Sequence, residues 1–312
     1  MLRFLTAGES HGKSLTALVE GIPANLPLTE EYIERHMARR QVGYGRGGRM
    51  QIEKDRAEIL SGVRHGLTMG SPISMLILNR DWATGKGPDG VPWVDEMNIA
   101  PTDVPFEAIT SLRPGHADTP GIAKYMQADA RNILERSSAR ESAARVAAGA
   151  IAQRFLEEFG VEIHGHVVCI GGVHAKPQGS IDWDLLEESP YHRENLNGSK
   201  IAAVRCADED AAAKMIVEID SAREAGDSLG GIIEIVATGL PVGLGSFIQW
   251  DRKITTHLAA AVMSINAVKG VEFGAGFAQA DLRGSQVHDV VKPVEEWELH
   301  PSGDWLRPWP RR

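Results

Sequence analysis

Ser10 and His11 lie together in a glycine-rich segment, Ala-Gly-Glu-Ser-His-Gly-Lys-Ser, at residues 7–14. Its ending in Gly-Lys-Ser fits a loose phosphate-binding P-loop, although the break at Gly21-Ile22-Pro23 leaves little room for the helix that should follow. The pattern Gly-x-Ser-x-Gly fits the nucleophile elbow of serine hydrolases, but too few residues precede Ser10 to supply the oxyanion-donating loop. Two further interpretations are a pocket at a strand end and an ordinary turn with a solvent-facing histidine.

Basic side chains are concentrated between residues 35 and 56, where only Glu53 and Asp55 oppose them in the second half of the segment. The cluster consists of Arg35, Arg39, Arg40, Arg46, Arg49, Lys54 and Arg56. Guanidinium groups match carboxylates and phosphates, and the glycines between residues 43 and 48 allow close backbone approach. We expect a small polyanionic ligand here. The alternatives are a solvated helix end and an RNA-binding Arg-Gly segment, for which Tyr44 alone offers few stacking partners.

A second histidine, His116, follows Pro114-Gly115 in the sequence Arg-Pro-Gly-His-Ala-Asp. The Pro-Gly pair predicts a turn that presents the imidazole, and Asp118 is placed to orient it. Histidine suits proton transfer near neutral pH, although a lone histidine is more often structural or exposed.

Hydroxyl groups precede an alanine-rich stretch in the sequence Arg-Ser-Ser-Ala-Arg-Glu-Ser at residues 136–142. Hydroxyls and free N–H groups near a helix start suit a phosphate or a polar cofactor. The alternative without a ligand is a capping box that runs from Ser138 to Glu141. Two glycine-rich motifs, at residues 227–231 and 264–277, are individually typical of turns.

The elements that must position these residues follow from periodicity and turn signals. Strands are predicted at residues 2–7, 15–20, 74–78, 161–168 and 232–238. Helices are predicted at residues 29–40, with Thr29 as N-cap, within 123–159, at 211–224 and at 258–268. Residues 41–50 are predicted to form a loop. Residues 81–106, rich in Gly, Pro, Asp and Trp, are predicted to form a long irregular segment.

The composition of the 312-residue chain is that of a globular protein, with 43% hydrophobic and 24% charged residues. Its net charge of −9 excludes a generally basic nucleic-acid binder. The two cysteines, Cys169 and Cys206, have no metal-ligand spacing and suit a reducing compartment. No run approaches the roughly 18 apolar residues of a membrane span. We therefore expect a cytoplasmic protein that binds no metal, membrane or nucleic acid.

Taken together and in this order, the motifs resemble those of chorismate synthases. The motifs that carry the resemblance are Gly8-Glu-Ser-His-Gly12, Tyr44-Gly-Arg-Gly-Gly-Arg-Met50, Ser61-Gly-Val-Arg64, Arg113-Pro-Gly-His-Ala-Asp118, Arg136-Ser-Ser-Ala-Arg-Glu141, Asp227-Ser-Leu-Gly-Gly231, Lys269-Gly-Val-Glu272 and Gly284-Ser-Gln-Val-His-Asp289. The resemblance covers residues 1–289, which we predict to form one domain. Residues 290–312 hold four prolines and three tryptophans and lack the family's later motifs. We interpret them as a divergent tail left by truncation, a frameshift or a replaced exon.

The resemblance implies an α/β fold, an α+β layered sandwich in which helices pack between antiparallel sheets of a single large domain. It also implies a homotetramer. The implied reaction is the 1,4-anti elimination of phosphate from 5-enolpyruvylshikimate 3-phosphate to give chorismate, a carbon–oxygen lyase step of the shikimate pathway that requires reduced FMN. The alternative is a truncated remnant that binds anions but turns over weakly or not at all, and we expect weak FMN binding and little activity from a chain of this length.

The resemblance also implies a role for each residue of this chain that matches a functional position of the family. His11 would protonate the departing phosphate, and His116 would donate a proton toward the flavin. The implied flavin contacts are Arg136, Ser137, Ser138, Asn266 and Ala267, while Arg40 and Arg46 are also positions tied to NADP(H). The implied substrate contacts are Ser10, Arg40, Arg46, Arg49 and Arg140.

Overall fold

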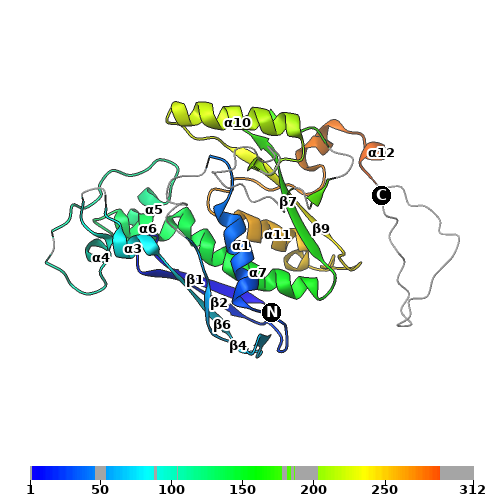
Figure 1. Ribbon diagram of the computed structural model, residues 1–312. Coiled ribbons are helices and arrows are strands. Elements are labelled where there is room, and N and C mark those ends of the chain that lie inside the picture. Colours follow the sequence, from blue (N-terminus) through cyan, green and yellow to red (C-terminus); the bar gives the residue numbers. More distant parts are fainter. Residues whose placement is uncertain are drawn as a thin grey trace. The chain divides into compact units, whose positions relative to one another are not determined.

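The computed structural model describes residues 2–45, 54–87, 90–103, 105–177, 181–183, 186 and 203–288 (Figure 1). The chain divides into two compact units, Met1–Gly239 and Leu240–Arg312, and each is described by itself. Arg46, Arg49 and the tail at residues 290–312 lie outside the described residues. The prediction of one domain over residues 1–289 stays a prediction.

The first unit begins with an antiparallel sheet in the order β1-β2-β6-β3. Its strands are β1 (Arg3–Gly8), β2 (Ser14–Glu20), β3 (Glu58–Ser61) and β6 (Ile73–Leu78). A separate small hairpin joins β4 (Val63–Arg64) to β5 (Leu67–Thr68). Alternate residues of the central strands are buried, among them Leu15 and Val19 on β2 and Met75 on β6. This alternation gives the sheet one apolar face.

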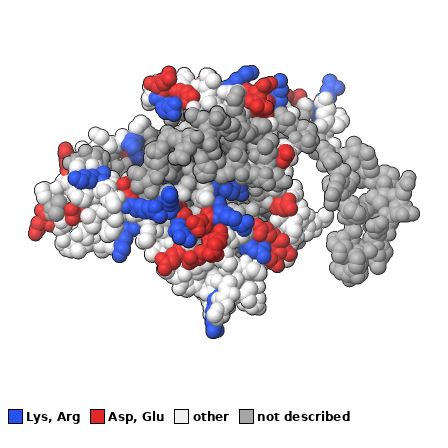
Figure 2. Space-filling view, viewed as in Figure 1, with Lys and Arg blue, Asp and Glu red and all other residues white. Residues whose placement is uncertain are grey.

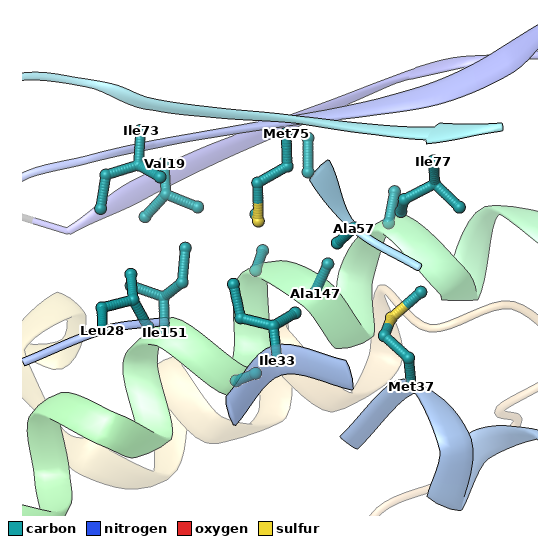
Figure 3. Packing of buried hydrophobic residues seen from close by; sticks show 14 of the residues in the cluster. Val19, Leu28, Ile33, Met37, Ala57, Ile73, Met75, Ile77, Ala147 and Ile151 are labelled. Carbon is teal, nitrogen blue, oxygen red and sulfur yellow. The ribbon is translucent and has the colours of Figure 1, made fainter. Parts of the chain in front are cut away.

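Two helices pack on the apolar face, as the buried cluster in Figure 3 shows. Helix α1 (Glu30–Gln41) begins where the Thr29 hydroxyl accepts a hydrogen bond from the backbone N–H of Tyr32, as predicted, and it buries Ile33 and Met37. Helix α7 (Ser142–Glu157) buries mainly alanines. Small side chains let its backbone approach the sheet closely.

We expect Ala147→Leu to lower the free energy of unfolding by about 1–3 kcal/mol, because Ala147 is 0% exposed within this close-packed cluster. Gly149 is the matched control on the same helix, since a methyl group there would meet no atom within 4 Å. Gly149→Ala should instead stabilise the protein, by about 0.5–1 kcal/mol. Urea unfolding of both variants tests the packing, and equal effects of the two substitutions would contradict it.

A second antiparallel sheet has the order β8-β7-β9. Its strands are β7 (Glu162–Ile170), β8 (Val173–His174) and β9 (Gly231–Thr238). Helix α10 (Glu209–Glu224) packs against β7 and β8 and starts at an Asp208 cap. Helix α7 contacts β7 as well as β1, β2 and β6, so it touches both sheets. The mixed α/β class with antiparallel sheets is thereby confirmed.

Between the strands of the two sheets, the secondary structure of the described residues differs from the predicted one. The segment at residues 81–106, predicted to be irregular, contains the short helices α3 (Arg80–Thr84) and α4 (Trp93–Glu96). The helical stretch at residues 123–159 is several elements, namely α5 (Asp118–Tyr125), α6 (Arg131–Ser137), the 3₁₀ turn η1 (Ala139–Glu141) and α7. Met126, with φ 51°, ends α5, and the extended backbone of Ser138 separates α6 from η1.

The second unit is helical in its described part, residues 240–288. It contains η2 (Trp250–Arg252), α11 (Ile254–Met263), η3 (Gly276–Asp281) and α12 (Gly284–Val287). Helix α11 therefore starts before the predicted range of 258–268 and ends earlier. Its C-cap is Ser264, and Ala267 beyond it has φ 71°, a left-handed conformation that no helix continues through.

Candidate functional site

Ser10 and His11 occupy the turn that joins β1 to β2. Gly8 ends β1 with φ 104°, where a Cβ would stand 2.3 Å from the Ser14 carbonyl oxygen, so the turn requires glycine there. The element after the turn is a strand, whereas a P-loop and a nucleophile elbow both lead into a helix. The structure therefore excludes both of these interpretations. The pocket at a strand end and the ordinary turn both stay open.

Glu135, at the end of α6, holds both residues of this turn. Its Oε2 accepts hydrogen bonds from the Ser10 hydroxyl at 2.6 Å and from the His11 backbone N–H at 2.7 Å. The His11 Nδ1 lies 3.0 Å from Oε1. The Ser10 backbone N–H also donates to the Glu135 carbonyl at 3.0 Å. A hydroxyl, an imidazole and a carboxylate are thus gathered within hydrogen-bonding distance, the arrangement that proton transfer requires.

The other contacts of the His11 ring come from the segment predicted to be irregular. The imidazole stacks on the Trp93 ring, with centroids 4.0 Å apart and planes 18° apart. Its Nε2 lies 3.8 Å from Asp81 Oδ2. The Arg131 guanidinium lies 5.2 Å from the Trp93 centroid and 3.7 Å from Glu135 Oε1. Short helices α3 and α4 therefore supply Asp81 and Trp93 to the site.

Two opposing effects act on the Glu135 carboxyl. Burial raises its pKa, whereas hydrogen bonds from His11 and Ser10 lower it, and together the lowering contributions prevail and hold the pKa below its usual 4.5. Glu135 is therefore ionised near neutral pH and acts only as a hydrogen-bond acceptor.

A buried ionic group lies beside this turn. Asp55, whose side chain is 0% exposed, accepts from Arg40 Nη1 at 2.9 Å and lies 2.6 Å from Arg140 Nη1. Arg140 also donates through Nε to Asn79 at 3.1 Å, and the Asn79 amide donates to the Gly12 carbonyl at 2.7 Å. The structure thus brings together Arg40 and Arg140, two of the predicted substrate contacts, and links them to the turn that carries His11.

Basic and acidic side chains alternate on the visible surface. Figure 2 shows Lys and Arg next to Asp and Glu on the face that it draws, among the residues that it colours. The buried group differs from this surface because two guanidiniums share one carboxylate.

The predicted flavin contacts of the first unit lie at the end of α6 and the start of η1. Arg136 is exposed and donates through Nη2 to the Thr6 carbonyl and hydroxyl, each at 2.9 Å. Ser138 caps η1 by accepting from the Arg140 N–H, while Ser137 donates to the Leu134 carbonyl at 3.5 Å. An exposed guanidinium beside two hydroxyls is a donor set that fits a phosphorylated anion.

The turn at Pro114-Gly115 presents His116 to solvent, as predicted, and its Nδ1 lies 3.1 Å from the Pro114 carbonyl oxygen. Asp118 is engaged elsewhere, because it accepts hydrogen bonds from the backbone N–H and the guanidinium of Arg113 at 2.9–3.1 Å. These side-chain hydrogen bonds from Arg113 are the main reason that the pKa of Asp118 lies below its usual 3.8.

We expect Asp118→Asn to lower the free energy of unfolding at pH 7 and to have less effect in acid. The pKa of Asp118 is lower in the folded state, so its contribution is complete above pH 3.8 and is lost as the pH falls through the folded-state pKa. Urea unfolding at a series of pH values measures this, with the exposed Asp103→Asn as control. An Asp118→Asn deficit that stays constant into strong acid would contradict the prediction.

The remaining predicted contacts lie elsewhere. Asn266 and Ala267 are exposed residues of the second unit, in the turn after α11. Arg46 and Arg49 fall outside the described residues.

Sequence reasoning missed residues that hold the site together, above all Glu135, Asp55 and Asn79. The spacing of Arg131 and Glu135 on one helix face was the one available signal, since residues four apart on a helix are neighbours. Asp55 was read only as a charge opposing the arginines.

Three further observations concern the described parts of the chain. No helix there combines the length and apolar character needed to cross a membrane. His, Cys, Asp and Glu side chains nowhere gather there in a group of three or more that could hold a metal ion. Cys169 and Cys206 are both buried, and both are free cysteines that form no disulfide bond.

Known proteins resemble this chain over most of its length. A family model described as "Chorismate synthase" matches residues 2–303, which extends past residue 289. The chorismate synthase of Geobacillus sp. (strain WCH70) is 52% identical over 293 residues, covering 93% of this chain and 71% of the relative. That of Shouchella clausii (strain KSM-K16) is 51% identical over 302 residues, covering 95% and 73%. A crystal structure of chorismate synthase aligns with a TM-score of 0.70 and 44% identity, covering 93% of this chain and 74% of that one. Matches of this extent and identity show that the chain belongs to the chorismate synthase family.

Proposed function

We propose that this chain catalyses the reaction after which its family is named, the 1,4-anti elimination of phosphate from 5-enolpyruvylshikimate 3-phosphate to give chorismate. The observation that carries the proposal is the cluster of Ser10, His11 and Glu135 beside the buried ionic group of Arg40, Asp55 and Arg140. Such a site combines a proton-transfer group with positive charge, and both are needed to release phosphate.

The substrate carries two carboxylates and a phosphate, so its site must supply cations. In this proposal Ser10, Arg40, Arg46, Arg49 and Arg140 bind it. Arg40 and Arg140 are only 8% and 4% exposed, and they share a single carboxylate. Guanidinium groups bind carboxylates and phosphates through paired hydrogen bonds, so these two arginines suit an anionic ligand.

His11 transfers the proton in this proposal. An imidazolium that protonates the departing phosphate lowers the barrier to C–O cleavage, and Ser10 lies at its side, with the hydroxyl oxygen 3.0 Å from Nδ1. Stacking on Trp93 restricts the ring to one plane. The chain's contribution is thus to position a proton donor near the anion-binding arginines.

We further propose that reduced FMN binds at Arg136, Ser137 and Ser138 of the first unit. Asn266 and Ala267, in the second unit, are proposed flavin contacts on the family resemblance alone. The exposed guanidinium of Arg136 and the two hydroxyls suit an anionic phosphorylated cofactor. When bound, reduced FMN would supply electron density that assists C–O cleavage without net redox change. His116, presented to solvent by its turn, holds a proton toward this site.

Other properties of the family extend to this chain as proposals. Arg40 and Arg46 are the candidate NADP(H) contacts, the layered sandwich is the expected complete fold, and a cytoplasmic homotetramer is the expected state. Native mass spectrometry of the purified chain tests the tetramer directly.

The activity test is an anaerobic assay with chemically reduced FMN and 5-enolpyruvylshikimate 3-phosphate, in which phosphate and chorismate are measured together. Equal amounts of the two products support the proposal, and a matched reaction with oxidised FMN should give neither. Calorimetry on the same preparation separates the alternative, because a chain that binds the substrate but releases no phosphate is the anion-binding remnant.

A further inference from the structure

The carboxylate of Glu135 contacts two consecutive residues through both of its oxygens. Oε2 accepts from the Ser10 hydroxyl and from the His11 backbone N–H, and both Oε1 and Oε2 lie 3.0 Å from His11 Nδ1. The side chain is 4% exposed. Arg131 lies 3.7 Å from Oε1 and pairs in turn with Glu96, so a buried cation accompanies the buried carboxylate.

The donor and acceptor roles in this group follow from its chemistry. An ionised carboxylate only accepts, so the contact with Nδ1 is a hydrogen bond when that nitrogen carries the proton. Ser10 leads to the same result. Its hydroxyl lies 3.0 Å from Nδ1, but its hydrogen is donated to Glu135, so toward the ring the oxygen acts as an acceptor. Two acceptors therefore face Nδ1.

We propose that Glu135 is a positioning residue that keeps a proton on His11 Nδ1 and thereby makes Nε2 the nitrogen that delivers the catalytic proton. The part of this inference that concerns delivery rests on the proposed function, whereas the placement of the proton on Nδ1 does not. Asp81 lies 3.8 Å from Nε2, on the opposite side of the ring from Nδ1. Arg131 lies 3.7 Å from Glu135 Oε1 and pairs with Glu96 of α4. The carboxylate fixes which nitrogen is protonated, as the second hydrogen bond of a catalytic histidine generally does.

Glu135→Gln tests the proposal because it exchanges one acceptor for a donor. With the amide oxygen in place of Oε2, the hydrogen bonds from Ser10 and from the His11 N–H persist. The amide NH₂ then replaces Oε1 at 3.0 Å from Nδ1, while the amide oxygen stays 3.0 Å from the same nitrogen. Nδ1–H therefore loses one acceptor and meets a donor in its place, so the share of the neutral ring that is protonated at Nε2 rises. The reverse amide orientation would leave the backbone N–H of His11 facing a second donor.

The direct measurement is ¹⁵N NMR of the full-length chain labelled at histidine, at a pH where the ring is neutral. The parent should show a protonated Nδ1 and Glu135→Gln a larger share of the ring protonated at Nε2, with the His11 signals assigned by their loss in His11→Asn. Glu141→Gln is the matched control, because Glu141 is another buried carboxylate but bonds to Thr6 and Arg145. Its His11 signals should match those of the parent. An unchanged share of Nε2 protonation in Glu135→Gln, or a protonated Nε2 in the parent, would overturn the proposal.

Kinetics supply the second measurement. We expect kcat of Glu135→Gln to fall ~10²–10⁴-fold, the range that a general acid contributes, with little change in KM. An unchanged kcat despite an exchanged tautomer would overturn the role in proton delivery. If the parent itself has no activity, the proposed function fails, and the NMR result still decides whether Glu135 places the proton.

Discussion

Replacing His11 with alanine is expected to lower kcat for phosphate elimination by ~10²–10⁴-fold, the amount that a positioned general acid supplies. The ring is held by Glu135 on one edge and by Trp93 on one face, and alanine removes the imidazole that these contacts position. The measurement is the rate of chorismate formation under anaerobic conditions with reduced FMN.

A matched histidine variant makes the His11 result specific. His65 is exposed at the β4–β5 turn with φ 52°, a conformation that asparagine also tolerates. His65→Asn should therefore retain the parent rate. If His11→Ala turns over as fast as His65→Asn while both stay folded, His11 is not the proton donor.

The substitution Asp55→Ala is expected to reduce the free energy of unfolding by about 3–5 kcal/mol, the cost of breaking a buried ion pair by removing one partner. Asp55 is the carboxylate that Arg40 and Arg140 share, and its removal leaves their two positive charges close together in the interior. Arg40 also donates to Ser142 at the start of α7, so the loss reaches the helix that covers the sheet. Urea or thermal unfolding measures the change.

The exposed pair of Arg56 and Glu34 provides the contrast, with side chains 66% and 42% exposed and a separation of 3.3 Å. Glu34→Ala should cost only about 0–1 kcal/mol, because solvent screens an exposed pair. Similar losses for Glu34→Ala and Asp55→Ala would show that the buried group contributes no more than a surface contact.

The elements that the sequence predicted well are those with a strong local signal. Helix α1 has its Thr29 cap and buried residues at Ile33 and Met37, so both its start and its inward face were readable. Strand β2 alternates cleanly. Helices α3 and α4 have five and four residues, too few for a helical period to show.

The motifs of the candidate site could be recognised in the sequence, but the contacts between them could not. His11 and Ser10 stood out because of the glycines around them. Glu135 lies more than a hundred positions away, and the contact depends on how α6 docks beside the first hairpin. No local pattern encodes such a pairing. The sequence also suggested that Asp118 orients His116, but its hydrogen bonds go to Arg113.

The contact of α7 with the first sheet has a consequence for synthesis on the ribosome. Strand β6, the last of that sheet, ends at Leu78, and α7 does not begin until Ser142. Roughly 60 residues must be translated in between, which takes about 3–12 s at 5–20 residues per second. During that interval α1 is available to cover Leu15, Met75 and Ile77, but α7 is not. A nascent chain in this state exposes a half-covered apolar sheet, so its yield should depend on chaperones that bind it before α7 emerges.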